Sequence, residues 1–266
     1  MTIGFIGLGN MAKAMIGGIL AKGLMGTNEI IGTAATEASR QKAAEKFGIQ
    51  TRSSNEAVAK EADIIILAVK PQYLKGVIAE IMDCVDDSKV VVSIAAGKTI
   101  SWYAQEFEKP VKVIRVMPNT PALVLEGCSA VCRNDLVTDE DFHFVLELLE
   151  SFGKAYTVPE SMMDVVVGVS GSSPAYVFLF IEAMADAAVA GGMPRKQAYE
   201  FAAQSVLGSA KMVLETGKHP AELKDMVCSP GGTTIEAVKV LEEKGFRGAI
   251  EDAMDACVKR NRELGA

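Results

Sequence analysis

The chain has 266 residues, is 49% hydrophobic and carries a formal net charge of −7 with no long basic run. This length allows one large domain or two modest ones, each with a substantial core. The acidic balance argues against a nucleic-acid partner or an anionic membrane surface. Since no charged and apolar leader precedes the first predicted strand, we expect no secretory signal.

Cysteine and histidine usage argues against metal chemistry and histidine catalysis. The five cysteines form no C-x-x-C pair and are odd in number, which is typical of reduced thiols in a cytoplasmic protein. Cys128 and Cys132 are spaced as metal ligands can be, but with two histidines in the whole chain, small buried apolar side chains are the favoured interpretation. We expect surface or capping roles for His143 and His219. The sequence therefore predicts no metal site.

The longest apolar stretch, residues 165–193, falls short of a membrane span. Residues 170–174 interrupt it with three serines, a glycine and a proline, and Glu182 and Asp186 follow. The purely apolar run that remains, 176–181, is far shorter than the roughly 20 residues that a spanning helix needs. We therefore predict no membrane segment and no membrane partner.

The first apolar run, 3–6, predicts a buried strand, and apolar residues at helical spacing follow over 10–22. Between them stands Gly7-Leu8-Gly9-Asn10-Met11-Ala12, a G-x-G-x-x-A pattern. Its first glycine permits a tight turn, its second lets the backbone approach a pyrophosphate, and its alanine allows close helix packing. The free amides at the helix start then hold the anion. In this context we predict dinucleotide binding rather than an ordinary glycine turn.

Strands and helices alternate through the rest of the first half. Near-continuous apolar strands such as 63–69 are typical of a parallel sheet. The other predicted strands are 29–33, 89–96, 111–117, 129–132 and 155–158, and helices are predicted at 36–47 and 138–151. We therefore predict an α/β, doubly wound, Rossmann-type domain at residues 1–159, with ligands at the carboxyl ends of its strands.

The end of the second strand bears on the choice of cofactor. An enzyme that uses NAD places an Asp or Glu there to bind the ribose 2′-hydroxyl, whereas this chain has Thr33-Ala34-Ala35-Thr36. A 2′-phosphate can bind among these hydroxyls and amides, with Ser39 and Arg40 close by, so NADP is favoured. Glu37 is interpreted as a carboxylate at a helix start, although a shifted turn would bring it to the ribose. Arg40 has the alternative role of a solvated helix residue.

Two later strand ends supply the rest of the predicted groove. Ala68-Val69-Lys70-Pro71 ends one strand in a proline that forces a bend, and Ile94-Ala95-Ala96-Gly97 ends the next in residues too small to obstruct a nicotinamide. Lys70 is either a cofactor contact or a solvated side chain. The proline-containing loop 117–122 is stiff and presents Asn119, either to the groove or as a cap of its own turn.

The pattern becomes helical after Pro159. Helices are predicted to about Gly191 and then over 195–215, 221–227, 235–244 and 246–264. Residues 160–266 thus form an all-helical domain. Its first part is rich in Ala, Gly and Ser between aromatic residues and leaves too little polar surface for a solitary domain. Homodimerisation through these helices is our hypothesis.

One loop in the second half predicts a binding site for a carboxylate. In Cys228-Ser229-Pro230-Gly231-Gly232-Thr233-Thr234-Ile235-Glu236, the paired glycines leave the backbone amides uncovered at a helix start. The hydroxyls of Ser229 and Thr234 and the amides of 231–234 form a compact cradle for the anion, helped by the helix dipole. The alternative is a capped helix start, because Thr233 and Glu236 match a capping box. Capping explains Thr233 but not the whole run.

Four segments resemble pyrroline-5-carboxylate reductase of the bacterial type. They are Gly4-Phe5-Ile6-Gly7-Leu8-Gly9-Asn10-Met11, Met117-Pro118-Asn119-Thr120-Pro121, Gly168-Val169-Ser170-Gly171-Ser172-Ser173-Pro174-Ala175-Tyr176 and Leu223-Lys224-Asp225-Met226-Val227-Cys228-Ser229-Pro230-Gly231-Gly232-Thr233-Thr234. The resemblance implies reduction of L-1-pyrroline-5-carboxylate to L-proline by NADPH, with NADH possible, as the last step of proline synthesis. It also implies a cytoplasmic enzyme and an interlocked dimer that commonly assembles into five dimers.

The motifs and the resemblance together give a set of expected site residues. For the cofactor they are Ile6, Gly7, Leu8, Gly9, Asn10, Met11, Thr33, Ala34, Asn55, Ala68, Val69, Lys70, Pro71, Ile94, Ala95, Ala96 and Asn119. For the substrate they are Glu160, Ser229, Pro230, Gly231, Gly232, Thr233 and Thr234, with Thr234 also expected to be catalytic.

The chemistry needs positioning more than it needs a strong acid, because a protonated cyclic imine already accepts hydride. Some relatives carry a threonine where this chain has Val167, which cannot donate a proton. The proton then arrives with the substrate, from water or from Thr234. A β-hydroxyacid reductase with the same plan would need a lysine on the second domain's first helix, and residues 165–193 contain none. A nucleotide-sensing protein without turnover is the non-enzymatic alternative.

Overall fold

The computed structural model describes residues 1–265 and divides into two compact units. The sheet unit comprises Met1–Ser172 and the end of the chain from Cys257, and the helical unit comprises Ser173–Ala256. The boundary predicted at residue 159 therefore differs from the one between the compact units. The physical reason is that residues just beyond 159 contact the sheet: Glu160 pairs with Arg115, and Met163 packs against Ala130 and Cys132.

The sheet unit is built on one eight-stranded sheet in the order β3-β2-β1-β4-β5-β6-β7-β8. All neighbouring strands are parallel except β6 and β7. The strands are β1 (Ile3–Ile6), β2 (Ile30–Thr33), β3 (Gln50–Thr51), β4 (Ile64–Leu67), β5 (Val90–Ser93), β6 (Lys112–Met117), β7 (Gly127–Arg133) and β8 (Gly153–Thr157). Every residue of β1, β2, β4 and β5 is buried, as expected of parallel strands that are covered on both faces.

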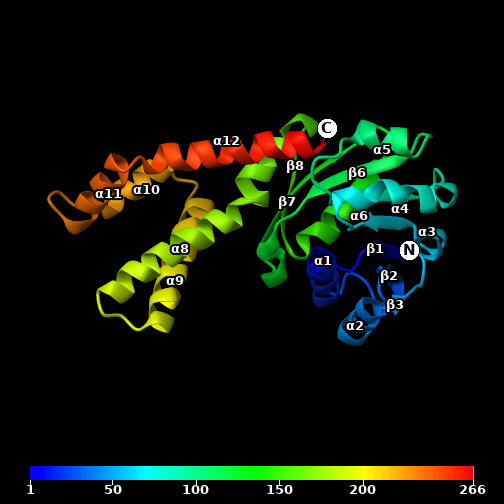
Figure 1. The fold of residues 1–266 in the computed structure, drawn as a ribbon, viewed down its shortest axis with the longest axis horizontal. Coiled ribbons are helices and arrows are strands. Elements are labelled where there is room, and N and C mark those ends of the chain that lie inside the picture. Colours follow the sequence, from blue (N-terminus) through cyan, green and yellow to red (C-terminus); the bar gives the residue numbers. More distant parts are fainter. Residues whose placement is uncertain (266) are drawn as a thin grey trace. The chain divides into compact units, whose positions relative to one another are not determined.

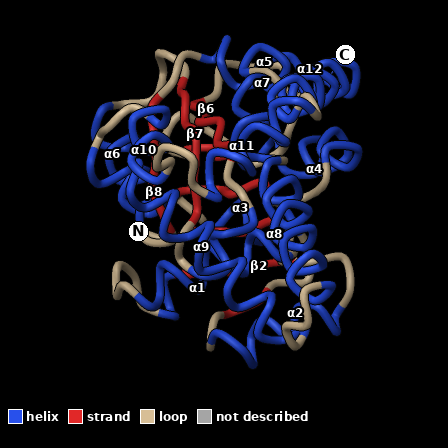
Figure 2. The backbone as a smooth tube through the Cα atoms, turned by 90° about the vertical axis from the view of Figure 1, so that its left-hand side faces the viewer, coloured by secondary structure: helices blue, strands red, loops and turns tan. Residues whose placement is uncertain are grey.

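Helices cover both faces of this sheet (Figures 1 and 2). The helices of one apolar core are α1 (Asn10–Ala21), α2 (Glu37–Phe47) and α6 (Asp139–Glu150). Those of the other core are α3 (Asn55–Glu61), α4 (Leu74–Ile81) and α5 (Ile100–Glu106). The alternating side chains of β1 show the division, because Ile3 and Phe5 belong to the first core and Ile6 to the second. The prediction of a doubly wound Rossmann-type domain is confirmed.

The sequence analysis placed the long elements correctly and missed the short ones. No prediction covered β3, α3, α4 or α5, each of at most eight residues and too short for a periodic pattern to stand out. Predicted strands such as 63–69 also proved longer than the observed Ile64–Leu67, because the last residues turn into the loop at the sheet edge. Short turns of 3₁₀-helix lie at Thr27–Glu29, Pro71–Tyr73, Met82–Cys84, Thr120–Val124 and Glu160–Met162.

From residue 160 onward every element is helical, as predicted. The elements are α7 (Met163–Val166), a π-helical turn (Val167–Gly171), α8 (Ser173–Ala190), α9 (Arg195–Thr216), α10 (Pro220–Val227), α11 (Thr233–Glu243) and α12 (Phe246–Gly265). Residues 170–174, which interrupt the apolar run of the sequence, hold the junction of two helical elements: the π-helical turn ends at Gly171, Ser172 is a bend and α8 begins at Ser173. The Ser170 hydroxyl donates to the Val166 carbonyl at 3.3 Å, and Pro174 stands at the second position of α8, where its missing N–H is tolerated.

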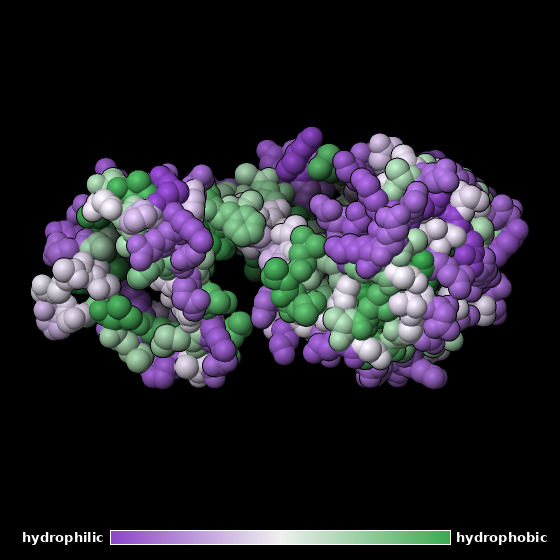
Figure 3. Space-filling view, turned by 90° about the horizontal axis from the view of Figure 1, so that it is seen from below, coloured by the Kyte–Doolittle hydropathy of each residue, from purple (hydrophilic) through white to green (hydrophobic). Residues whose placement is uncertain are grey.

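The continuous helical chain Glu160–Ala190 is long and apolar enough to cross a membrane by length and composition alone, with a mean hydropathy of 1.5. Only 17% of its most apolar window is buried. One such helix is weak grounds for a membrane protein, because a helix that packs on a partner subunit meets the same criterion. Apolar side chains also lie exposed elsewhere on the helical unit, where Figure 3 shows green surface. Phe201 is 63% exposed and Leu214 78%.

A capping threonine gives a direct test of helix α6. The Thr138 hydroxyl accepts a hydrogen bond from the Asp141 amide at 3.1 Å. Losing such a cap costs about 1 kcal/mol, so Thr138→Ala should lower the Tm of the protein by about 2–4 °C in a calorimetric scan. Thr138→Ser keeps the hydroxyl and should retain the parental Tm. An unchanged Tm in the alanine variant would show that the cap does not stabilise the unit.

Candidate active site

The glycine turn after β1 ties three strand ends together. Gly7 has φ +102°, and its N–H donates to the Thr33 carbonyl at 3.0 Å. A Cβ on Gly7 would lie 2.6 Å from the Ala68 carbonyl oxygen, so no other residue fits there. The ends of β1, β2 and β4 therefore meet at this residue.

The start of α1 beyond this turn is open to an anion. Gly9 is the N-cap, no side chain caps the helix and no acidic residue lies in the first turn. A Cβ built on Gly9 would meet nothing within 4 Å, so the backbone there is accessible. Ala12 is fully buried beneath it. This is the arrangement in which helix amides bind a pyrophosphate.

A groove of about 600 Å³ continues from the glycine turn along the strand ends. It brings together five residues predicted for the cofactor: Gly7, Thr33, Ala34, Asn55 and Val69. Ile6 and Leu8, predicted with them, are buried at 0% and 4%, so they offer only their backbone to a ligand.

Six residues of this groove were not predicted from the sequence: Ser53, Ser54, Tyr73, Gly76, Val77 and Glu80. Two of them are the large side chains of Tyr73 and Glu80, and the Glu80 carboxylate accepts a hydrogen bond from the Asn55 side-chain amide at 2.7 Å. Both follow β4 and lie at or near α4, a helix that was not predicted.

The β2 end of the groove fits a ribose 2′-phosphate. The Arg40 guanidinium lines the groove and donates to the Ala34 carbonyl at 2.7 Å. Thr36 caps α2 by accepting from the Ser39 amide at 3.2 Å, which places two hydroxyls beside that turn. Glu37 is exposed in the first turn of α2 and does not line the groove. No carboxylate follows β2 directly to repel a phosphate. The polar side chains at this turn are the Arg40 guanidinium and the Thr36 and Ser39 hydroxyls.

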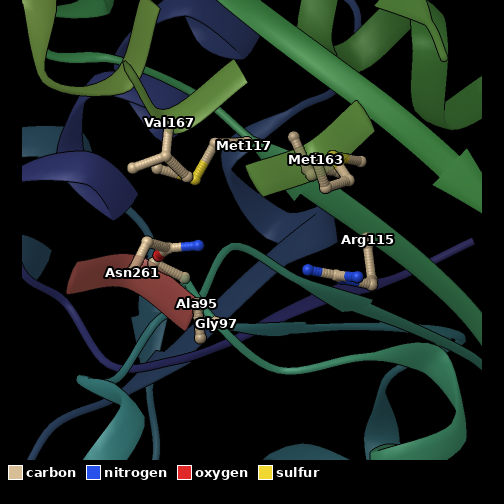
Figure 4. Close-up of a pocket in the computed structure, with 9 residues that line it drawn as sticks. Ala95, Gly97, Arg115, Met117, Met163, Val167 and Asn261 are labelled. Carbon is tan, nitrogen blue, oxygen red and sulfur yellow. The ribbon is translucent and has the colours of Figure 1, made fainter. Parts of the chain in front are cut away.

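The β5 end forms a second, narrow pocket. Ala95, Ala96 and Gly97 line it together with Val167 of the π-helical turn and Asn261 of α12. Figure 4 shows the Arg115 guanidinium and the Asn261 amide extending into this pocket from opposite sides. The pocket has small side chains at the strand end, and its volume of about 10 Å³ is room for a water molecule only. A nicotinamide would therefore lie against its mouth.

Three other predicted cofactor contacts have different surroundings. Lys70 is exposed, and with Pro71 it begins the 3₁₀ turn after β4. Asn119 is 7% exposed, and its side chain does not cap its own turn. Its amide donates to the Ser170 carbonyl at 3.0 Å and its oxygen accepts from the Cys128 amide at 2.8 Å. Asn119 thus joins its loop to β7 and to the π-helical turn.

Glu160 lies in an ion pair inside the sheet unit. Its Oε1 atom accepts from the Ile100 amide at 2.7 Å and also bonds to the Arg115 guanidinium. The Arg115 side chain is 9% exposed and the Glu160 side chain 35%. Sequence reasoning assigned Glu160 to the substrate and did not foresee this pair.

The loop 228–232 of the helical unit differs in one amide from the carboxylate site predicted at 231–234, because the Gly232 amide is used within the loop. Gly231 has φ +66°, which favours glycine, and the Gly232 amide donates to the Ser229 carbonyl at 3.0 Å. The capping box that Thr233 and Glu236 match, the alternative interpretation of this loop, does not form. Gly232 is the N-cap without a side-chain hydrogen bond, and Thr233 is already the first residue of α11. The first amides of α11 are therefore free of a capping side chain.

The loop's exposure suits a ligand site as well. Ser229, Pro230 and Gly231 are exposed, while Gly232 and Thr234 are half-buried. Thr234 is the second residue of α11, in the turn whose amides have no capping side chain.

One buried phenol and two cysteine thiols of the sheet unit stay protonated near neutral pH. Burial raises the pKa of Tyr103 to about 12, and burial raises that of Cys132 to about 11. Burial also raises the pKa of Cys128. These thiols are therefore poor nucleophiles. Within residues 1–265, no cluster of three or more His, Cys, Asp or Glu side chains is placed to hold a metal ion.

Comparison with known proteins identifies the family. Residues 160–264 match a model described as pyrroline-5-carboxylate reductase dimerisation, and residues 2–97 match one described as NADP oxidoreductase, coenzyme F420-dependent. The chain is 55% identical over 262 residues to pyrroline-5-carboxylate reductase of Escherichia coli (strain K12), which covers 98% of this chain and 97% of that protein. The chain belongs to the pyrroline-5-carboxylate reductase family. Its resemblance to that family, predicted from four sequence segments, is confirmed.

Pyrroline-5-carboxylate reductases of other organisms are similar to this chain in sequence and fold. The enzyme of Methanosarcina acetivorans is 45% identical over 263 residues, covering 99% of this chain and 97% of that protein. The Plasmodium falciparum pyrroline carboxylate reductase with NADP bound superposes with a TM-score of 0.92 at 32% identity, covering 100% and 98% of the two chains. The Coxiella burnetii pyrroline-5-carboxylate reductase also gives 0.92, at 35% identity and the same coverage. Prephenate dehydrogenase of Aquifex aeolicus, 14% identical with a TM-score of 0.56, shares the fold alone.

Arg40 should set the preference of this reductase for a phosphorylated cofactor. A charge-assisted bond from its guanidinium to the 2′-phosphate would be lost in Arg40→Ala. The Kd for NADPH should then rise about tenfold to a hundredfold, while the Kd for NADH stays unchanged, as measured by isothermal titration calorimetry.

Arg52→Ala is the matched control for this measurement, since Arg52 pairs with Glu61 and does not line the groove. It should leave both Kd values unchanged. Equal weakening of NADPH and NADH in the Arg40 variant would place the 2′-phosphate elsewhere.

Proposed function

We propose that this chain reduces L-1-pyrroline-5-carboxylate to L-proline by hydride transfer from NADPH, the last step of proline biosynthesis. The 55% identity to the E. coli pyrroline-5-carboxylate reductase over 98% of the chain carries the proposal. Arg40 at the β2 end of the groove supports NADPH as the cofactor. We propose NADH as a possible second cofactor.

The sheet unit would hold the cofactor along the carboxyl ends of its strands. The amides of Leu8, Gly9, Asn10 and Met11 suit the pyrophosphate, since α1 begins there without a capping side chain, while the Gly7 amide is already bonded to the Thr33 carbonyl. Thr33, Ala34 and Asn55 would contact the adenosine end of the cofactor. The segments 68–71 and 94–96 would line the path to the nicotinamide, and bound NADPH supplies the hydride.

The helical unit would hold the substrate by its carboxylate. The uncapped amides at the start of α11 and the hydroxyls of Ser229 and Thr234 form a set of donors for one anion. The proposal requires this loop, from the same chain or from a second copy, to meet a bound cofactor. Fixing the ring at one end lets the imine carbon be aligned with the hydride donor, and alignment supplies most of the rate.

Protonation of the ring nitrogen needs no strong acid. The iminium form of the substrate brings its own proton, and Thr234 is the group of this chain that we propose as catalytic, with water as the other source. Val167 cannot donate, and its side chain is 8% exposed in the pocket beside Ala95. Low demand for acid catalysis agrees with the high pKa values of Tyr103 and Cys132, about 12 and about 11.

Thr234→Ala tests the carboxylate loop. Loss of one charge-assisted hydrogen bond should lower kcat/KM for the cyclic imine by one to two orders of magnitude, that is, about tenfold to a hundredfold. The measurement follows NADPH absorbance in the presence of the imine.

Two variants control this test. Thr234→Ser keeps the hydroxyl and should retain most of the activity. Thr216→Ala removes a hydroxyl at the end of α9 that bonds to the Met212 carbonyl, and it should leave kcat/KM unchanged. An unchanged kcat/KM in Thr234→Ala would show that the loop does not bind substrate.

We also propose a cytoplasmic homodimer, with assembly into a decamer and no membrane segment. The dimerisation model matches residues 160–264, which include the apolar run that is long enough for a membrane span. A second copy would cover the exposed aromatic and aliphatic side chains of α8 and α9, such as Phe178 at 62% and Leu179 at 67%. The net charge of −7 and five free cysteines agree with a cytoplasmic enzyme.

Analytical ultracentrifugation tests the assembly. At micromolar concentration and without detergent, the protein should sediment as a dimer or as a multiple of dimers. Phe178→Lys places a charge on the exposed apolar face and should shift the distribution toward smaller species. Lys196→Glu, an exposed charge change on α9, is the control and should leave the distribution in place. A parental protein that sediments as a monomer would contradict the proposal.

A further inference from the structure

The segment that links β5 to α5 forms one wall of the pocket at the β5 end. Its first part, 95–97, lines that pocket. Its last part, 98–100, leads into α5. A nicotinamide that lies along this strand end would touch the segment directly, so the segment's position decides where the hydride donor stands.

The β5 side of this segment is fixed by a buried hydroxyl pair. The Ser93 hydroxyl is hydrogen-bonded to the Tyr103 hydroxyl, and it accepts from the Ala95 amide at 3.3 Å. Tyr103 is 0% exposed and Ser93 is 1% exposed, so water does not compete for these bonds.

The α5 side is fixed by Glu160. Thr99 caps α5 by accepting from the Trp102 amide at 3.1 Å, which leaves the first amide, that of Ile100, to another acceptor. Glu160 Oε1 is that acceptor, at 2.7 Å. The bond spans 60 residues of sequence, so it joins α5 to the chain that follows β8.

Glu160 also neutralises a charge behind the pocket. Arg115 stands on β6, opposite Ser93 of β5 and Cys132 of β7 in the sheet register, and its side chain is 9% exposed. Its guanidinium lines the pocket together with Gly97 and Asn261 (Figure 4). A buried guanidinium without its carboxylate is free to turn toward any other acceptor, including a ligand in the pocket.

We infer that Glu160 is a positioning residue: one carboxylate oxygen holds both the Ile100 amide and the Arg115 guanidinium, and so fixes the segment 95–100 against which the nicotinamide is placed. The inference rests on the proposed course of the cofactor along 94–96. It gives Glu160 a role beside the substrate contact that the resemblance implied, because Oε1 is already bonded within the sheet unit.

Glu160→Gln separates the two roles. Glutamine has nearly the same shape and still offers an oxygen to Ile100, but it leaves Arg115 without a counter-charge. We expect kcat with saturating NADPH to fall about tenfold to a hundredfold, because a small displacement of the donor is costly, while KM for the imine stays within about twofold.

The single tryptophan of the chain provides a readout that does not depend on turnover. Trp102 lies in the first turn of α5, two residues after Ile100, and its ring packs edge-on against Tyr103 at 5.0 Å between centroids. Its emission in the protein without cofactor should shift in Glu160→Gln. Glu61→Gln, which breaks an exposed pair with Arg52, is the matched control and should change neither emission nor kcat.

If Glu160→Gln does not fold, two double variants test the bond to the Ile100 amide instead. Arg115→Met/Glu160→Gln and Arg115→Met/Glu160→Ala both lack the buried cation and differ only in the acceptor for Ile100. The inference predicts a shifted Trp102 emission and a kcat at least about tenfold lower in the alanine version.

The outcomes are distinguishable from failure of the proposed function. If the parental enzyme does not oxidise NADPH in the presence of the imine, the proposed function is wrong. If the parental enzyme is active and Glu160→Gln keeps its kcat and emission but raises KM for the imine, Glu160 is a substrate contact and the inference is overturned. Equal kcat in the two double variants would overturn it as well.

Discussion

The cofactor groove depends on one main-chain hydrogen bond, from the Gly7 amide to the Thr33 carbonyl. It forms because Gly7 adopts φ +102° and has no Cβ, which lets the chain pass within van der Waals contact of the Ala68 carbonyl. The ends of three parallel strands are thereby drawn to one edge, and α1 begins at that edge with its amides uncovered. The groove residues that follow the other strands line a common groove because this turn fixes the strand ends next to one another.

The rest of the chemistry is positioning rather than acid and base catalysis. A hydride passing to an iminium carbon needs the two carbons aligned and the charges around them fixed. The sheet unit fixes the surroundings of the reacting carbons with buried neutral groups, such as the Ser93 and Tyr103 hydroxyls, and with the ion pair between Arg115 and Glu160. The helical unit contributes backbone amides at the start of α11. These amides carry a partial positive charge that does not change with pH.

The fold and part of the groove could be predicted from the sequence because the governing patterns are local. Buried parallel strands are continuous apolar runs, and the glycine turn lies between the first strand and the first helix. Sequence reasoning failed where the partner is distant in sequence: Glu160 bonds across 45 residues to Arg115, and Asn119 across 51 to Ser170. It also failed at Thr233, since a capping pattern cannot tell whether the threonine or the preceding glycine ends the loop. Tyr73 and Glu80 were missed because they follow β4 at or near α4, a helix too short to show a period.

The most direct measurement of the central claim is a crystal structure of the protein with NADP⁺ and L-proline bound together. The account predicts that the proline ring carbon next to nitrogen lies about 3.5 Å from C4 of the nicotinamide. It also predicts that the carboxylate accepts hydrogen bonds from the amides of Gly231, Thr233 and Thr234, and that the nicotinamide lies on Ala95 and Ala96. Proline bound away from the nicotinamide, or with its carboxylate on other residues, would contradict it.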